Sequence, residues 1–66
     1  MKITVNGTPR EAAANLALAD LLNDYKLNPK TTLVELNREV LDRSVYDTTQ
    51  LQDGDTVELV RFVGGG

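Results

Sequence analysis

The sequence predicts an α+β fold in which a mixed sheet packs on one main helix, and three observations carry this prediction. Apolar and polar residues alternate near both ends of the chain, in residues 1–5 and 56–63, as they do in half-buried strands. Between them, residues 18–25 have apolar side chains at helical spacing. A chain of 66 residues is long enough for one domain with a small core.

The first hairpin is predicted around the dipeptide Asn6-Gly7, which follows the alternating residues 1–5 directly. Both turn residues tolerate the positive φ angles of a type I′ turn. A second strand should therefore run antiparallel through about residues 8–13. Because Pro9 has no N–H for a central ladder, this second strand should lie at an edge of the sheet.

The clearest helix is predicted over residues 18–25. Its apolar stripe is expected to pack against the sheet and consists of Leu18, Leu21, Leu22 and Tyr25. Asn15 is a candidate N-terminal cap for this helix. The dipeptide Asn28-Pro29 is expected to end it, because the residue before a proline avoids the helical region.

Two short strands are predicted after the helix. They cover residues 33–37 and 39–41 and surround the turn residues Asn37 and Arg38. Residues 44–49 are expected to be irregular or to form one helical turn.

The last strand is predicted to start from a tight turn at Asp53-Gly54-Asp55, and Leu51 should return to the core just before it. The elements then follow the order strand, strand, helix, strand, short strand, strand. This order matches a β-grasp, a mixed sheet of four to five strands curled over one helix. Its first and last strands lie side by side and parallel.

The composition argues against most self-contained enzyme mechanisms. Without cysteine or histidine, the chain offers no disulfide, no thiol nucleophile and no imidazole base. The carboxylate pairs Asp20/Asp24 and Asp53/Asp55 fall where a solvated helix face and a turn would place them, whereas acid–base catalysis needs perturbed carboxylates in a pocket. We therefore expect neither a catalytic residue nor a metal site.

Charge and hydropathy restrict the partners. A net charge of −3 argues against nucleic-acid binding, which needs a basic surface, and favours a basic protein partner. Residues 1–5 have neither a long apolar segment nor the organisation of a signal peptide. We expect no membrane insertion and a cytoplasmic location.

Three glycines follow the last strand directly, at positions 64–66. Ordering glycine costs much conformational entropy, so a domain gains little stability from such a run. Without Cβ atoms, however, the run can lie extended in a narrow enzyme channel. A flexible linker is the alternative explanation. We divide the chain into a domain, residues 1–63, and a flexible tail, residues 64–66.

Four segments, spread over nearly the whole chain, match one known family: Asn6-Gly7, Asp20-Leu21-Leu22, Leu36-Asn37, and Leu51-x-Asp53-Gly54-Asp55-x-Val57-Glu58 leading to Val63-Gly64-Gly65-Gly66. On these segments the chain resembles the ubiquitin-like sulfur carriers, most closely the ThiS family of thiamin biosynthesis. The turn, the strand and the glycine end in this order are the specific part. Poor capping residues around Ala17 and the third glycine at position 64 depart from the family pattern.

The resemblance implies a carrier protein that is a substrate of partner enzymes and not an enzyme. A ThiF/MoeB-like adenylyltransferase would use ATP to attach AMP to the Gly66 carboxylate. A sulfur donor such as a cysteine desulfurase would then allow a thiocarboxylate to form, and a ThiG-like thiazole synthase would receive the sulfur. Gly64 and Gly65 would enter the partner's active site. The carrier itself would bind no cofactor.

A docking patch is predicted on the last strand and its neighbour. If Val57 and Leu59 point to the core, alternation places Val60 and Phe62 on the opposite face, and Leu33 extends the apolar area. Single exposed apolar side chains are common on protein surfaces. The alternative is therefore that Phe62 only covers the edge of the sheet and binds no partner. The predicted partner-docking patch is Leu33, Val60 and Phe62.

Two other kinds of function stay open at this point. A MoaD-like carrier for molybdopterin synthesis also ends in two glycines, although that family is usually longer. A different class is a β-grasp module that binds partners without covalent chemistry, or a ubiquitin-like modifier conjugated to lysines.

Overall fold

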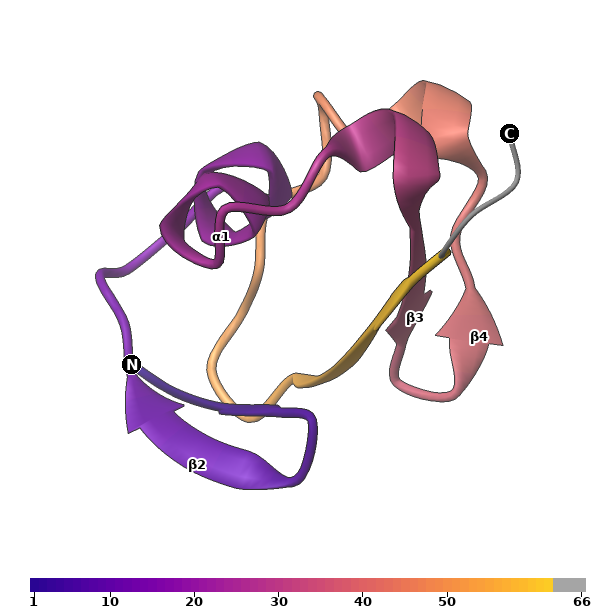
Figure 1. Ribbon diagram of the computed structural model, residues 1–66. Helices are drawn as coiled ribbons and strands as arrows, with labels where there is room; N and C mark the ends of the chain where they lie inside the picture. Colours follow the sequence, from indigo (N-terminus) through magenta and orange to yellow (C-terminus); the bar gives the residue numbers. More distant parts are fainter. Residues whose placement is uncertain (63–66) are drawn as a thin grey trace.

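The computed structural model describes residues 1–62. In chain order the elements are β1 (Lys2–Val5), β2 (Thr8–Glu11), α1 (Leu18–Asp24), the 3₁₀ turn η1 (Pro29–Thr31), β3 (Thr32–Leu36), β4 (Glu39–Val40), the 3₁₀ turn η2 (Arg43–Val45) and β5 (Thr56–Arg61). The strands form one five-stranded sheet in the order β2-β1-β5-β3-β4. Figure 1 shows α1 lying across one face of this curved sheet. The predicted α+β β-grasp is confirmed.

β1 and β5 come from distant parts of the chain and lie side by side at the centre of the sheet. They pair in parallel, with Thr4 opposite Thr56 and Val5 opposite Val57. On its other side, β5 pairs antiparallel with β3. The predicted parallel neighbours are therefore present, and the chain between them forms β2, α1, β3 and β4.

The core fills the space between α1 and the inner face of the sheet. Its buried hydrophobic residues are Ile3, Val5, Leu18, Leu21, Leu22, Val34, Tyr46, Leu51, Val57 and Leu59. The Tyr46 hydroxyl is satisfied inside this core, since it donates to the Thr32 carbonyl at 3.0 Å and accepts from the Val34 N–H at 3.1 Å. Leu51 is buried, as predicted.

Both hairpin turns adopt the left-handed backbone that a type I′ turn requires. Asn6 and Gly7 have φ angles of 49° and 82°, and Asn37 and Arg38 have φ angles of 50° and 71°. The turn before β5 also contains a positive φ, 87° at Gly54. These three turns lie where the sequence places them.

The helix starts without the predicted cap. Asn15 has a φ angle of 61° and lies outside α1, and Ala17 occupies the N-cap position without a side-chain hydrogen bond. A distant segment satisfies the backbone instead: the Leu18 N–H donates to the Thr49 carbonyl at 2.9 Å, and Ala17 forms a bridge with Gln50. A tertiary contact thus replaces the local cap.

The helix also ends earlier than predicted, at Asp24. Lys26 takes a φ angle of 57°, and its N–H donates to the Asn23 carbonyl at 3.0 Å, so the chain leaves the helix through a left-handed residue. Tyr25 is 40% exposed, and its placement in the core stripe was wrong. Asn28 instead caps η1, where its side chain accepts from the Lys30 N–H.

Candidate functional site

The outer face of the sheet, which points away from α1, carries the residues predicted to dock a partner. Val57 and Leu59 of β5 are buried. Val60 is 51% exposed, and Phe62, two residues further along the chain, is 55% exposed. The predicted alternation along this strand is confirmed. Phe62 follows the last residue of β5, and its N–H donates to the Thr31 carbonyl at 2.8 Å.

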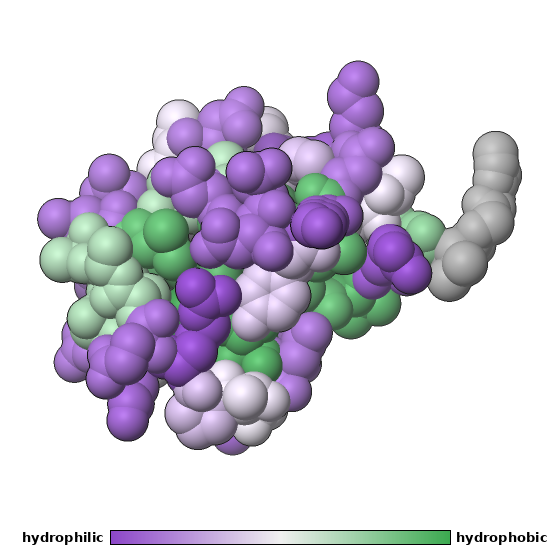
Figure 2. Space-filling model, turned by 60° about the vertical axis from the view of Figure 1, so that its left-hand side comes forward, coloured by the Kyte–Doolittle hydropathy of each residue, from purple (hydrophilic) through white to green (hydrophobic). Residues whose placement is uncertain are grey.

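Leu33 lies beside Val60 on this outer face. The two residues are direct partners in the β3–β5 ladder, so their side chains project from the same side of the sheet. Leu33 is half-buried. We call Leu33, Val60 and Phe62 the apolar patch. Figure 2 shows hydrophobic side chains at the surface beside the point where the described chain ends.

Two carboxylates lie next to the apolar patch. Glu35 is the direct partner of Glu58 in the same ladder, and both side chains project from the outer face. Like charges directly opposite each other destabilise a sheet. Neither residue forms an ion pair within residues 1–62, where the ion pair found is Arg10–Asp24. This pairing of two glutamates was not predicted from the sequence, because it depends on the register of β3 against β5.

Val40 adds an apolar residue that the sequence analysis did not single out. It is the β4 partner of Glu35 and is 61% exposed. Its position in a two-residue strand gave no alternation from which its face could be read. Glu35 lies between Val40 on β4 and Glu58 on β5, so Val40 borders the carboxylate pair.

Two asparagine side chains hold β5 in place. Asn6 Oδ1 accepts from the Leu59 N–H at 2.7 Å, and Asn37 Oδ1 accepts from the Thr56 N–H at 2.9 Å. Asn37 Nδ2 also donates to Asp55 Oδ1 at 3.0 Å. From the sequence, both asparagines were expected only as turn residues. A carboxamide at the first position of both turns was the signal available.

The carboxylates of the last turn have structural partners. Asp53 Oδ1 accepts from the Lys2 N–H at 2.7 Å, and Asp55 Oδ2 accepts from the Gln52 N–H at 2.8 Å. The first bond holds the turn before β5 against the start of β1, and the second closes the turn itself. The expectation that this pair serves the turn is confirmed.

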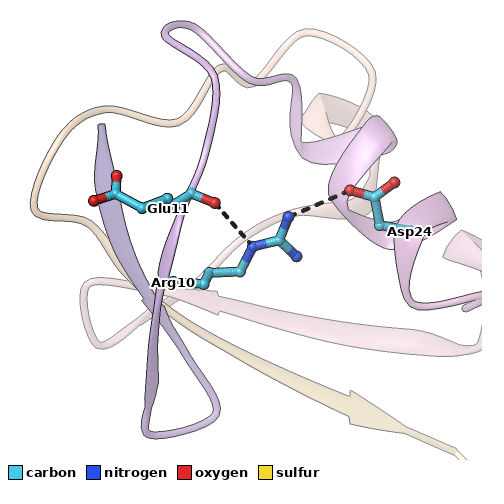
Figure 3. Close-up of polar contacts among 3 residues, drawn as sticks. All are labelled: Arg10, Glu11 and Asp24. Atoms are coloured by element: carbon cyan, nitrogen blue, oxygen red, sulfur yellow. Dashed lines mark hydrogen bonds and ion pairs between the residues drawn. The ribbon is translucent and has the colours of Figure 1, made fainter.

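Asp24 contacts the edge strand β2 through Arg10. The Arg10 guanidinium lies 3.5 Å from the Asp24 carboxylate and 5.7 Å from the centre of the Tyr25 ring. Figure 3 shows this side chain reaching from β2 to the end of α1. The Tyr25 side chain, and then Asp24, raise the pKa of Arg10 above its usual value. The pair is partly exposed, so its contribution to stability is small.

Residues 1–62 enclose no pocket and bring no three metal-ligating side chains together. In the same part of the chain, no helix is long and apolar enough to cross a membrane. Gly64, Gly65 and Gly66 lie outside the described residues, as does Val63. Their predicted roles therefore stay predictions, and the structure bears only on the strand that leads to them.

The family model for ThiS matches residues 3–66. The sulfur carrier protein ThiS of Bacillus subtilis (strain 168) is 43% identical over 49 residues, which cover 74% of each chain. The crystal structure of the thiamine biosynthesis protein ThiS from Geobacter metallireducens superposes with a TM-score of 0.83 at 43% identity and covers 100% of both chains.

A longer protein also contains a matching region. A thiazole synthase of Magnetococcus marinus is 41% identical over 66 residues, which are 100% of this chain but only 20% of that protein. The chain has the same coverage of a thiazole synthase of Paramagnetospirillum magneticum, at 35% identity. It thus spans a small part of these two relatives. The family model, the bacterial carrier and the solved structure agree, and the chain belongs to the ThiS family.

Proposed function

We propose that this chain is a sulfur carrier of thiamin biosynthesis. The observation that carries the proposal is the match of the ThiS family model to residues 3–66. Two relatives that the chain covers over most of their length are named a sulfur carrier protein and a thiamine biosynthesis protein. In this role the chain is a substrate of other enzymes and needs no catalytic side chain of its own.

The reacting group of the proposal is the carboxylate of Gly66. A C-terminal carboxylate has a pKa of about 3.3–3.7, so at neutral pH it is an anion and a poor electrophile. A ThiF/MoeB-like adenylyltransferase would join it to AMP from ATP, with release of pyrophosphate. The terminal sulfur of a persulfide on a donor protein, such as a cysteine desulfurase, would then displace AMP and form an acyl disulfide with Gly66. A thiol would reduce this S–S bond, which leaves the thiocarboxylate on Gly66 and a disulfide on the thiol side.

A ThiG-like thiazole synthase would take up this sulfur. Relatives named thiazole synthase contain a region that matches the whole chain, which supports a thiazole synthase as the partner. Gly64 and Gly65 would enter the partner's active site, because residues without a Cβ atom fit a narrow channel. The carrier would hold no cofactor, and ATP would be used by the adenylyltransferase. Since adenylation consumes ATP, this chemistry would take place in the cytoplasm.

The apolar patch would dock the adenylyltransferase. Val60 and Phe62 are both more than half exposed and lie immediately before the residues that must reach the nucleotide. Apolar contacts with a polar surround are typical of protein interfaces. A basic residue on the partner would also relieve the repulsion between Glu35 and Glu58.

Mass spectrometry tests the proposal directly. The protein is incubated with the adenylyltransferase of its host, ATP and a sulfur source, and the intact mass and the mass of the C-terminal fragment are measured. We expect a gain equal to the replacement of one oxygen by sulfur, located at Gly66. A variant without Gly66, and one with a residue added after it, should show no gain.

An unchanged mass with an enzyme of proven activity would refute the carrier proposal. A β-grasp binding module would then be the better explanation. Full thiocarboxylate formation in the variant without Gly66 would refute the role of that residue. Adducts of high mass in cell extracts would instead indicate a modifier conjugated to lysines.

A further inference from the structure

β5 is paired on both sides along its first half only. On the β3 side, the ladder runs from Val57 to Arg61. On the β1 side, partners exist for Thr56 and Val57 alone, because β1 ends at Val5 and the chain turns away into the first hairpin. The second half of β5 therefore has one edge without a neighbouring strand.

The hydrogen bonds identify which backbone groups lie on that edge. The Val57 carbonyl accepts from the Asn6 N–H at 2.9 Å on the β1 side, whereas the Phe62 N–H donates on the β3 side. Backbone groups of successive residues point to alternate edges of a strand. Leu59 and Arg61 therefore direct their N–H and carbonyl groups to the β1 side.

Only one group on this second half has a partner there. The Leu59 N–H donates to Asn6 Oδ1, so a side chain continues the ladder for one step after β1 has ended. Among the described residues, none bonds on this side to the Leu59 carbonyl or to the N–H and carbonyl of Arg61. Arg61 is exposed. Such an open edge is a template for another strand.

The other edges of the sheet are closed to such pairing. In β2, the ladder places the backbone nitrogen of Pro9 on the outer side, where it has no hydrogen to donate. The side chain of Arg10 donates to the Glu11 carbonyl at 3.5 Å (Figure 3). β4 is only two residues long. The edge beside Leu59 and Arg61 has neither of these obstacles to strand pairing.

We propose that thiazole synthase binds this chain by adding an extended segment to the open edge of β5, in line with β1. The segment would donate to the carbonyls of Leu59 and Arg61 and accept from the Arg61 N–H. This inference rests on the proposed function. Thiazole synthase is chosen because two proteins of that name contain a region matching the chain. A segment bonded along this edge would also align the residues that follow Phe62 with the partner.

Amide hydrogen exchange tests the new pairing. The isotopically labelled chain is measured alone and in complex with the thiazole synthase of its host, and the amides of Arg61 and Phe62 are compared. In the free chain, the Phe62 amide should be protected and the Arg61 amide should exchange fast. In the complex, exchange at Arg61 should slow roughly tenfold or more, as a new backbone hydrogen bond requires. A complex in which Arg61 still exchanges fast would overturn the inference.

A pair of variants separates the backbone from the side chain. Arg61→Pro removes the N–H on the open edge and leaves the β3 ladder bonds in place, whereas Arg61→Ala removes the side chain and keeps the N–H. Dissociation constants for thiazole synthase should rise roughly tenfold for Arg61→Pro, with a much smaller rise for Arg61→Ala. Equal losses in both variants would overturn the inference.

Three further outcomes keep this inference separate from the proposed function. Weaker adenylation of Arg61→Pro with unchanged affinity for thiazole synthase would overturn the choice of partner. A wild-type chain that forms the thiocarboxylate and binds thiazole synthase without protection at Arg61 would refute only the strand pairing. A wild-type chain that forms no thiocarboxylate would refute the proposed function first. Hydrogen exchange on the wild type decides the matter even if Arg61→Pro does not fold.

Discussion

The two halves of β5 have the same backbone conformation but different surroundings. In the first half, residues 56–58, Val57 pairs with a strand on each side and is fully buried. Residues 59–61 keep one neighbouring strand, and Val60 at their centre is half exposed. The first half therefore fixes the strand in the domain, and the second half presents it to solvent. A small domain can in this way keep a rigid strand and still leave groups on it free for binding.

The junction between the two halves depends on a side chain. Asn6 occupies the turn that ends β1, and its carboxamide accepts the N–H of Leu59, the first residue of the second half. At the start of the strand, the Asn37 carboxamide accepts the N–H of Thr56 in the same way. The turns that reverse the chain thus also position the strand that leads to the tail.

The largest difference between the two halves is expected from a matched pair of valine substitutions. Val57→Ala removes buried methyl groups from the first half and should lower the free energy of unfolding by about 2 kcal/mol. Val60→Ala removes the same atoms from the exposed face of the second half and should cost less than about 1 kcal/mol. Denaturant unfolding of both variants measures the difference. Equal losses would show that the two halves contribute alike to stability.

A smaller effect, on binding, is expected from Phe62→Asp. The change places a charge at the end of the apolar patch and should raise the KM for the adenylyltransferase about tenfold, a change of about 1.4 kcal/mol. Stability should stay within about 0.5 kcal/mol, because Phe62 is exposed. Initial rates of pyrophosphate release measure the first quantity and thermal unfolding the second. Unchanged kinetics would remove Phe62 from the interface.

The smallest effect is expected at the junction. Asn6→Gly keeps a residue that tolerates positive φ but removes the acceptor of the Leu59 N–H, and should cost about 1 kcal/mol. Asn37→Gly is the matched control at the other turn. Its bonds are exposed, so water can replace them and the cost should be smaller. A larger loss for Asn37→Gly in denaturant unfolding would contradict the special role of Asn6.

Local signals predicted much of this molecule correctly. The turn pairs at Asn6 and Asn37, the edge position forced by Pro9, and the alternation that exposes Val60 all depend on backbone preferences or on the two-residue period of a strand. Such preferences act between residues close in the sequence. The order of the elements and the face on which the residues of β5 lie therefore followed from the sequence alone.

Other features of the fold depend on neighbours that lie far along the chain. Thr49 satisfies the start of α1, so no local cap was needed, and a left-handed residue at Lys26 moved Tyr25 out of the core. The register of β3 against β5 brought Glu35 opposite Glu58, and the early end of β1 left the edge at Arg61 open. Register and strand ends depend on how distant segments meet across the sheet, and no preference within a single segment specifies that meeting.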